Sequence, residues 1–134
     1  MERKITGIAA LIGMTAIILG AFGAHALKKQ LSIDQLGAFE TGVKYQMYHA
    51  LFLLFLGLNT LLEDKVKKTV LRLVIFGVIF FSGSIYLLST KPITGVDFKF
   101  IGIATPIGGA MLIVAWGVLL WNIWKVKDNI LIKK

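Results

Sequence analysis

The chain has 134 residues, of which 57% are hydrophobic and 16% charged, whereas an ordinary soluble domain carries about a quarter charged residues. A mean hydropathy of +0.80 and long charge-free stretches indicate one integral membrane domain over residues 1–134. The absence of cysteine excludes disulfides, thiolate catalysis and iron–sulfur clusters. We interpret the net charge of +8 as a signal of membrane orientation and of contact with anionic lipid, not with nucleic acid.

The first predicted span covers residues 5–27, which contain no Asp, Glu, Lys or Arg. Small residues recur on it at steps of three or four, a spacing that lets membrane helices pack closely. The small residues expected to pack, here and in later spans, are Gly13, Gly20, Gly23, Ala24, Gly77, Gly83, Gly108 and Gly109. The basic start and the sequence Ala24-His25-Ala26 also match a signal peptide cleaved after Ala26, and this alternative stays open.

Residues 32–44 predict a short amphipathic helix in the first outer loop. Ser32 and Gln35 have the spacing of a capping box, and apolar residues recur at about helical spacing. This helix would lie at the outer membrane surface and bend at Gly42 into the second span, residues 45–62.

The third and fourth predicted spans are residues 71–90 and 100–124. These spans are helices because hydrocarbon offers the backbone no hydrogen bonds. The expected fold is therefore an all-α integral membrane protein with four transmembrane helices in a compact bundle. Pro106 predicts a kink in the first half of the fourth helix.

Most of the basic residues flank one side of these spans. They are Arg3, Lys4, Lys65, Lys67, Lys68, Arg72, Lys125, Lys127, Lys133 and Lys134. Because cytoplasmic segments carry the excess of Lys and Arg, both termini are expected in the cytoplasm of a plasma-membrane protein.

Polar residues in or beside the spans are the candidate functional residues, because burying them in hydrocarbon is costly. His25 closes the first span and His49 lies in the first turns of the second, so both are expected near the outer face. The candidates are His25, Glu40, Lys44, Tyr45, Gln46, Tyr48 and His49. Among them, Glu40 and Lys44 have the spacing of an ion pair on one helical face.

The two histidines allow several interpretations. Histidines from two helices can ligate haem or a metal, but zinc needs three or four ligands and neither histidine has a partner at ligand spacing. We therefore predict no metal and no cofactor. Hydrogen bonds from both histidines that tie the first helix to the second are favoured. A solute pathway lined by Gln46, His49, Asn59 or Ser84 stays open.

The sequence contains no paired carboxylates, nucleophile elbow or phosphate loop. We therefore expect a non-enzymatic membrane protein that acts through lipids, another membrane protein or its own oligomers. The alternative is an oligomeric transporter or channel for a small solute or ion. A membrane enzyme or haem protein at the outer interface ranks third.

Four blocks of sequence carry a family resemblance: GAFGAH (20–25), FETGVKYQMYHA (39–50), FSGSIY (81–86) and ATPIGG (104–109). Together they resemble the small membrane proteins called domain of unknown function 423, which include YwdK- and YgdD-type bacterial proteins and animal transmembrane protein 256. The resemblance covers nearly the whole chain and implies four helices with the first retained, but no activity. The family's signature residues fall on Gly20, Gly23, His25, Glu40, Tyr45, Gln46, His49, Pro106 and Gly109.

Overall fold

Helices make up all the regular structure of the described chain. A computed structural model describes the backbone of residues 1–132 and the side chains of residues 1–125, and no strand occurs in this part. The longer elements are α1 (Glu2–His25), α2 (Ile33–Leu58), α3 (Asp64–Val78), the π-helix η2 (Ile79–Gly83), α4 (Ser84–Ser89) and α6 (Ala104–Ile132). The short elements are η1 (Leu27–Lys29), α5 (Lys91–Thr94) and η3 (Lys99–Ile101). The all-α prediction is confirmed.

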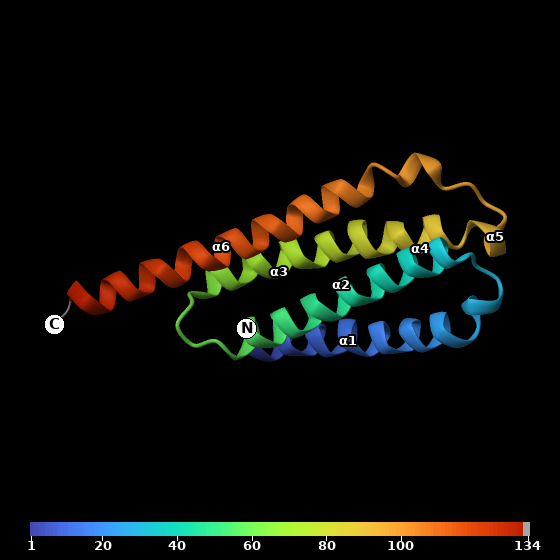
Figure 1. The fold of residues 1–134 in the computed structure, drawn as a ribbon. Coiled ribbons are helices and arrows are strands. Elements are labelled where there is room, and N and C mark those ends of the chain that lie inside the picture. Colours follow the sequence, from blue (N-terminus) through green and yellow to red (C-terminus); the bar gives the residue numbers. More distant parts are fainter. Residues whose placement is uncertain (133–134) are drawn as a thin grey trace.

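The long helices run side by side, with neighbours in opposite directions (Figure 1). α2 lies between α1 and the continuous segment formed by α3, η2 and α4, and α6 packs along α3 and η2. The start of α1, the loop 59–63 and the end of α6 lie at one end of the molecule. The loops 26–32 and 90–103 lie at the opposite end.

Three helical segments are long and apolar enough to cross a membrane: Glu2–Lys29, Asp64–Ser89 and Lys99–Lys125. α2 is of similar length, with 26 residues, but is not among them. Its first half carries Glu40, Lys44 and several uncharged polar residues, which lower its mean hydropathy.

One apolar core joins the four long segments. Ile5 of α1, Leu53 of α2 and Val74 of α3 are fully buried, and Leu112 and Ala115 of α6 complete the cluster. Lipid is as apolar as these side chains, so membrane helices associate through close packing rather than through the hydrophobic effect. The contacts made at glycine therefore matter for how these helices fit together.

α3 and α6 pack closely together at two glycines. A Cβ on Gly77 would lie 2.8 Å from Cγ of Leu112, and a Cβ on Gly108 would lie 2.8 Å from the carbonyl oxygen of Gly77 and against the backbone of η2. At Gly108 the contacts are with backbone and leave no room for a methyl group, whereas at Gly77 the Leu112 side chain would have to shift.

The small residues of α1 differ in their surroundings. Added Cβ atoms would lie 3.5 Å from Ala50 at Gly13, 3.3 Å from Val43 at Gly20 and 3.0 Å from Phe39 at Gly23, so these three glycines pack on α2. Two other residues expected to pack do not do so within this chain: Ala24 is exposed, and a Cβ on Gly83 would have no neighbour within 4 Å.

The segment 32–44 is the first half of α2, not a separate surface helix. Its capping box is present: Ser32 N–H donates to Gln35 Oε1 across 3.0 Å, and Gln35 N–H donates to Ser32 Oγ across 3.3 Å. The helix continues through Gly42 without interruption, and the Tyr86 and Ile85 side chains pack directly against this glycine.

Two further boundaries differ from the prediction. Pro106 lies in the first turn of α6, where the missing N–H has no partner to lose, so it marks the start of the helix instead of a kink. α2 ends at Leu58, before the expected residue 62. The side chain of Asn59 then accepts hydrogen bonds from the N–H groups of Leu61 and Leu62, at 2.9 and 3.1 Å.

The basic residues at the end that contains residue 1 are not all free for lipid. Lys67 is only 3% exposed, and its Nζ lies 3.6 Å from Oε1 of Glu2, which links α3 to α1. Lys133 and Lys134 lie outside the described residues, as does the side chain of Lys127. At the opposite end, a hydrogen bond from Lys91 lowers the pKa of Asp97.

Candidate functional site

A cavity of about 290 Å³ lies between α2, η2 and α6. It is lined by Tyr45, His49, Phe81, Gly109, Leu112, Ile113 and Trp116. His49 and Leu112 are buried and form its floor, whereas Tyr45, Ile113 and Trp116 are between 42% and 73% exposed and form its rim. The cavity therefore opens sideways on the outer surface of the helices.

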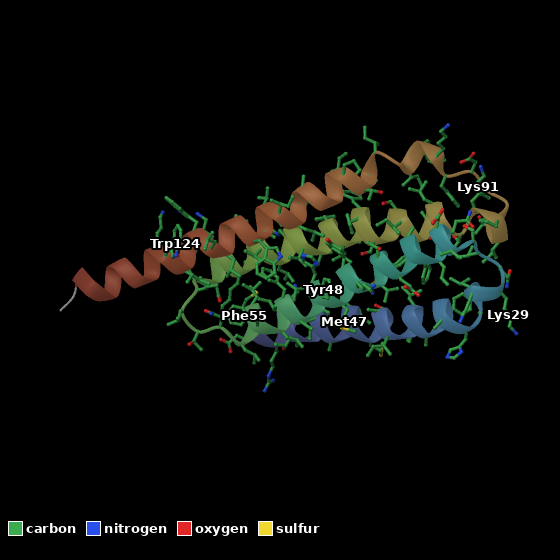
Figure 2. The ribbon with its side chains drawn as sticks, in the orientation of Figure 1. Lys29, Met47, Tyr48, Phe55, Lys91 and Trp124 are labelled. Atoms are coloured by element: carbon green, nitrogen blue, oxygen red, sulfur yellow. The ribbon has the colours of Figure 1, made fainter. Side chains whose placement is uncertain are left out.

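The cavity lies well inside the length of the helices. At about 1.5 Å per residue, His49 is about 24 Å from the start of α2 and about 14 Å from its end. Figure 2 shows the neighbouring Tyr48 between the end marked by Lys29 and Lys91 and the end marked by Trp124. His49 therefore lies far from the end of the molecule that holds the loops 26–32 and 90–103, because α2 begins at Ile33 and not near residue 45.

His49 has one satisfied and one unsatisfied ring nitrogen. Its Nδ1 lies 2.7 Å from the carbonyl oxygen of Tyr45. A carbonyl can only accept, so Nδ1 carries the proton, and Nε2 of the neutral ring is left as an acceptor. Among the described side chains, Nε2 is the one buried polar atom without a hydrogen-bond partner.

Aromatic rings surround this imidazole. The ring of Tyr45 lies nearly parallel to that of His49, with centroids 6.4 Å apart and planes at 22°, and it contacts Phe81 at 4.8 Å. Phe52 lies 6.1 Å from His49 and 4.4 Å from Trp116. Such walls favour a flat ring, since aromatic rings pack at centroid distances of about 4.5–7 Å.

Gln46 forms a separate hydrogen-bonded link between helices. Its Nε2 donates to the carbonyl of Ile12 at 3.0 Å and to Oγ1 of Thr15 at 2.8 Å, both on α1. Its Oε1 accepts from the hydroxyl of Tyr86 on α4 at 2.7 Å. The link between the first two helices, expected from the histidines, is therefore made by Gln46.

The other polar side chains in the predicted spans, Ser82, Ser84 and Asn59, also form hydrogen bonds within the protein. Ser82 Oγ donates to the carbonyl of Gly42 at 2.7 Å, and Ser84 Oγ lies 2.6 Å from Oγ1 of Thr105. Asn59 caps the loop after α2. Of the four residues named for a solute pathway, only His49 lines the cavity.

The structure does not bring His25 and His49 together. His25 is exposed at the end of α1. Since Gly23 packs on Phe39, His25 is about 18 Å from His49 along the helix axis. Glu40 and Lys44 are exposed on the first half of α2 and form no ion pair with each other. Within the described residues, no cluster of three or more His, Cys, Asp or Glu could hold a metal ion.

Sequence reasoning found Tyr45 and His49 but missed most of the cavity. Phe81 belongs to the π-helix η2, whose wider turn has no evident sequence signal. π-Helical turns are rare and often occur at functional sites. Trp116 was the one sequence signal that could have indicated the cavity. Tryptophans gather at the membrane interface, so a tryptophan deep within a predicted span is unusual.

The chain matches the family model described as protein of unknown function (DUF423) over residues 19–109. A UPF0382 membrane protein of Staphylococcus saprophyticus is 40% identical over 119 residues, which cover 89% of this chain and 95% of the relative. YwdK of Bacillus subtilis is 37% identical, with 81% and 86% covered. The inner membrane protein YgdD of Escherichia coli is 30% identical, with 94% and 93% covered. No solved structure shows significant similarity to the chain.

Proposed function

The chain belongs to the DUF423 family of membrane proteins, and we propose that it is a four-span plasma-membrane protein that binds a membrane-soluble molecule in the cavity beside His49. Its two termini face the cytoplasm, and binding, not catalysis, is its activity. The observation that carries the proposal is an apolar cavity of about 290 Å³, lined in part by His49, that opens sideways between the helices.

The packing of α2 on α1 supports four spans. Gly13 and Gly20 of α1 contact α2 over several turns, so α2 would cross the membrane wherever α1 does. The polar Gln46 and His49 are buried against other helices. The surface that α2 leaves for lipid includes the exposed and apolar Leu51, Phe55 and Leu58.

The distribution of charge supports the orientation. Basic residues gather at the end of the molecule that holds the start of α1 and the loop 59–63, as expected for a cytoplasmic face. There they would contact anionic lipid. The exposed Trp121 and Trp124 near this end would anchor α6 at the interface. The Escherichia coli relative, named an inner membrane protein, supports the plasma membrane.

The depth of the cavity supports a ligand that comes from the bilayer. Its rim residues Tyr45, Ile113 and Trp116 are far from both ends of the helices. A water-soluble substrate would have to cross hydrocarbon to reach them, whereas a membrane-soluble one would enter laterally. None of the lining residues is a carboxylate, which favours binding over acid–base catalysis.

Trp116 offers a direct test. Replacing Trp121 and Trp124 by Phe leaves Trp116 as the single tryptophan, since the chain has three. The protein is titrated in phosphatidylcholine nanodiscs with a brominated naphthalene, whose heavy atom quenches tryptophan fluorescence. Binding in the cavity should add a saturable component of Trp116 quenching to the linear background that collisions produce. Saturation would support the proposed binding.

Two leucine substitutions on α6 control this test. Gly109→Leu places its side chain in the cavity, because Gly109 lines it and an added Cβ would only touch the Phe81 ring at 3.6 Å. Gly117→Leu adds the same side chain where nothing lies within 4 Å. Saturable quenching should disappear in Gly109→Leu and persist in Gly117→Leu. Purely linear quenching in the unsubstituted cavity would overturn the proposed function.

A further inference from the structure

We infer that the exposed face of α2 is a dimer interface, in which Glu40 of each copy pairs with Lys44 of the partner subunit. The inference rests on the four-span arrangement proposed above and is independent of the ligand. It starts from two charges that lie at the depth of the membrane and form no ion pair among the described residues of their own chain.

Lys44 lies inside the length of the helices, and Glu40 lies one turn closer to the start of α2. An added Cβ on Gly20 would lie 3.3 Å from Val43, so Lys44 is about level with this glycine. At 1.5 Å per residue, Gly20 is about 8 Å from the end of α1 at His25. Both charged side chains are exposed. A charge that faces hydrocarbon without a partner is costly, so charges at this depth are expected to be paired.

The exposed face of α2 has the spacing of a seam between two helices. Its residues recur at alternating steps of four and three, as in a parallel coiled coil, and none of them is buried. From residue 37 to residue 58 the seam extends over about 32 Å, close to the thickness of the hydrocarbon core. Tyr48 and Phe55 mark it in Figure 2. The residues of the seam are Gly37, Thr41, Lys44, Tyr48, Leu51, Phe55 and Leu58.

The order of the charges makes this face complementary to itself. Two copies in one membrane have the same orientation, so a two-fold axis between them runs along the membrane normal and their α2 helices are parallel. Glu40 and Lys44 are separated by about 6 Å along the helix axis, which the four-carbon stem of lysine can span. Glu40 of each copy then faces Lys44 of the partner subunit, and the charges of the two copies balance.

The second half of the seam is apolar. Leu51, Phe55 and Leu58 are exposed, and a single copy presents them to lipid. In the dimer they pack on the partner subunit instead. Lipid is as apolar as these side chains, so this half contributes close packing but does not select the partner. The partner is therefore selected by the charged half, whose complement is a second copy of this chain.

Single cysteines test the interface, because the chain has none of its own. Leu51→Cys lies on the seam, and Leu11→Cys is its matched control, since the two leucines are 57% and 56% exposed. Their depths are similar because Gly13 packs on Ala50. Leu11 is about 200° from Gly13 around α1 and so faces away from α2.

Oxidation with iodine, which enters the bilayer, is carried out in native membranes. Leu51→Cys should give a disulfide-linked dimer, and Leu11→Cys should give none. A Leu51→Cys protein that stays monomeric, or equal yields at the two positions, would overturn the inference. The proposed ligand binding would be unaffected, because the quenching of Trp116 tests it separately.

Charge reversal in the Leu51→Cys protein tests the pairing between copies. Glu40→Lys places four basic side chains in a homodimer and Lys44→Glu places four acidic ones, so each change should lower the cross-linked fraction about tenfold or more. The double variant Glu40→Lys/Lys44→Glu exchanges the two charges and should cross-link like the parent protein.

Co-expression of the two single variants separates pairing between copies from pairing within one chain. With tags of different size, Glu40→Lys and Lys44→Glu should cross-link to each other, because every charge of one copy then opposes those of the other. Pairing within one chain predicts no such rescue. The inference fails if neither single variant loses cross-linking, or if neither the mixed pair nor the double variant recovers it.

Discussion

The carbonyl oxygen of Tyr45 accepts a hydrogen bond from Nδ1–H of His49 across 2.7 Å. Because the two residues lie one turn apart on α2, no neighbouring helix is needed to fix the orientation or the tautomer of the imidazole. The contact leaves Nε2 as a buried acceptor with no hydrogen-bond partner among the described side chains. Polar atoms left unpaired in a core reduce stability, and they are expected where function requires them.

His49→Phe should therefore stabilise the protein without ligand. The substitution removes a buried atom that has no partner, and the gain should exceed the loss of the bond to Tyr45, leaving about 1 kcal/mol in the free energy of unfolding. Denaturant titration in detergent measures it. His25→Phe, at an exposed position, should stay within about 0.5 kcal/mol of the wild type. A destabilised His49→Phe would contradict the assignment of Nε2 as unpaired.

Gln46→Leu should destabilise the protein by about 1–2 kcal/mol, because it breaks the link among α1, α2 and α4 and leaves the hydroxyl of Tyr86 without its partner. Removing both partners of a buried bond is nearly neutral compared with removing one. The double variant Gln46→Leu/Tyr86→Phe should therefore be about as stable as Gln46→Leu alone, or more stable than it. Strictly additive losses in this double-mutant cycle would show that the two side chains are not coupled.

Two of the glycines expected to pack should respond in opposite ways to alanine. At Gly108 a methyl group would meet the backbone of η2 and the carbonyl of Gly77. Gly108→Ala should therefore lower the free energy of unfolding by about 1–3 kcal/mol. At Gly83 nothing lies within 4 Å, so Gly83→Ala should be neutral or gain a few tenths of a kcal/mol, up to about 1 kcal/mol, from helix propensity. Thermal unfolding of both variants in one detergent compares them directly. Equal losses would argue against the α3–α6 crossing.

The absence of cysteine makes the topology directly measurable. Lys29→Cys, Lys65→Cys and Thr94→Cys place single thiols in or beside the three connections between the long helices. In spheroplasts of a bacterial host, a membrane-impermeant maleimide should label residues 29 and 94 directly and residue 65 only after lysis. Equal labelling of residues 29 and 65 from outside would mean that α2 does not cross the membrane.

Much of the helical architecture could be predicted from local chemistry. The charge-free run after Lys4 and the Ser32–Gln35 capping spacing act over a few residues, and the structure bears out both the helix and the cap. The length of α2 could not be predicted in the same way. Its first half is polar enough to suggest a surface helix, yet it is continuous with the second half through Gly42, against which Tyr86 packs.

The candidate site was predicted only in part, because it depends on which face of α2 meets which neighbour. Tyr45, Gln46 and His49 all stood out as polar residues in a span, but pattern alone could not assign Gln46 to α1 and His49 to the cavity. The wall supplied by Phe81 depends on the π-helical turn of η2, which shifts the register of the side chains after Val78.

Nitrogen-15 NMR of the His49 ring tests the central claim most directly. The chain has two histidines, so His25→Gln leaves His49 as the only labelled imidazole. In lipid bilayers, Nδ1 should give the signal of a protonated nitrogen and Nε2 that of an unprotonated one. A protonated Nε2, or an unprotonated Nδ1, would contradict the account.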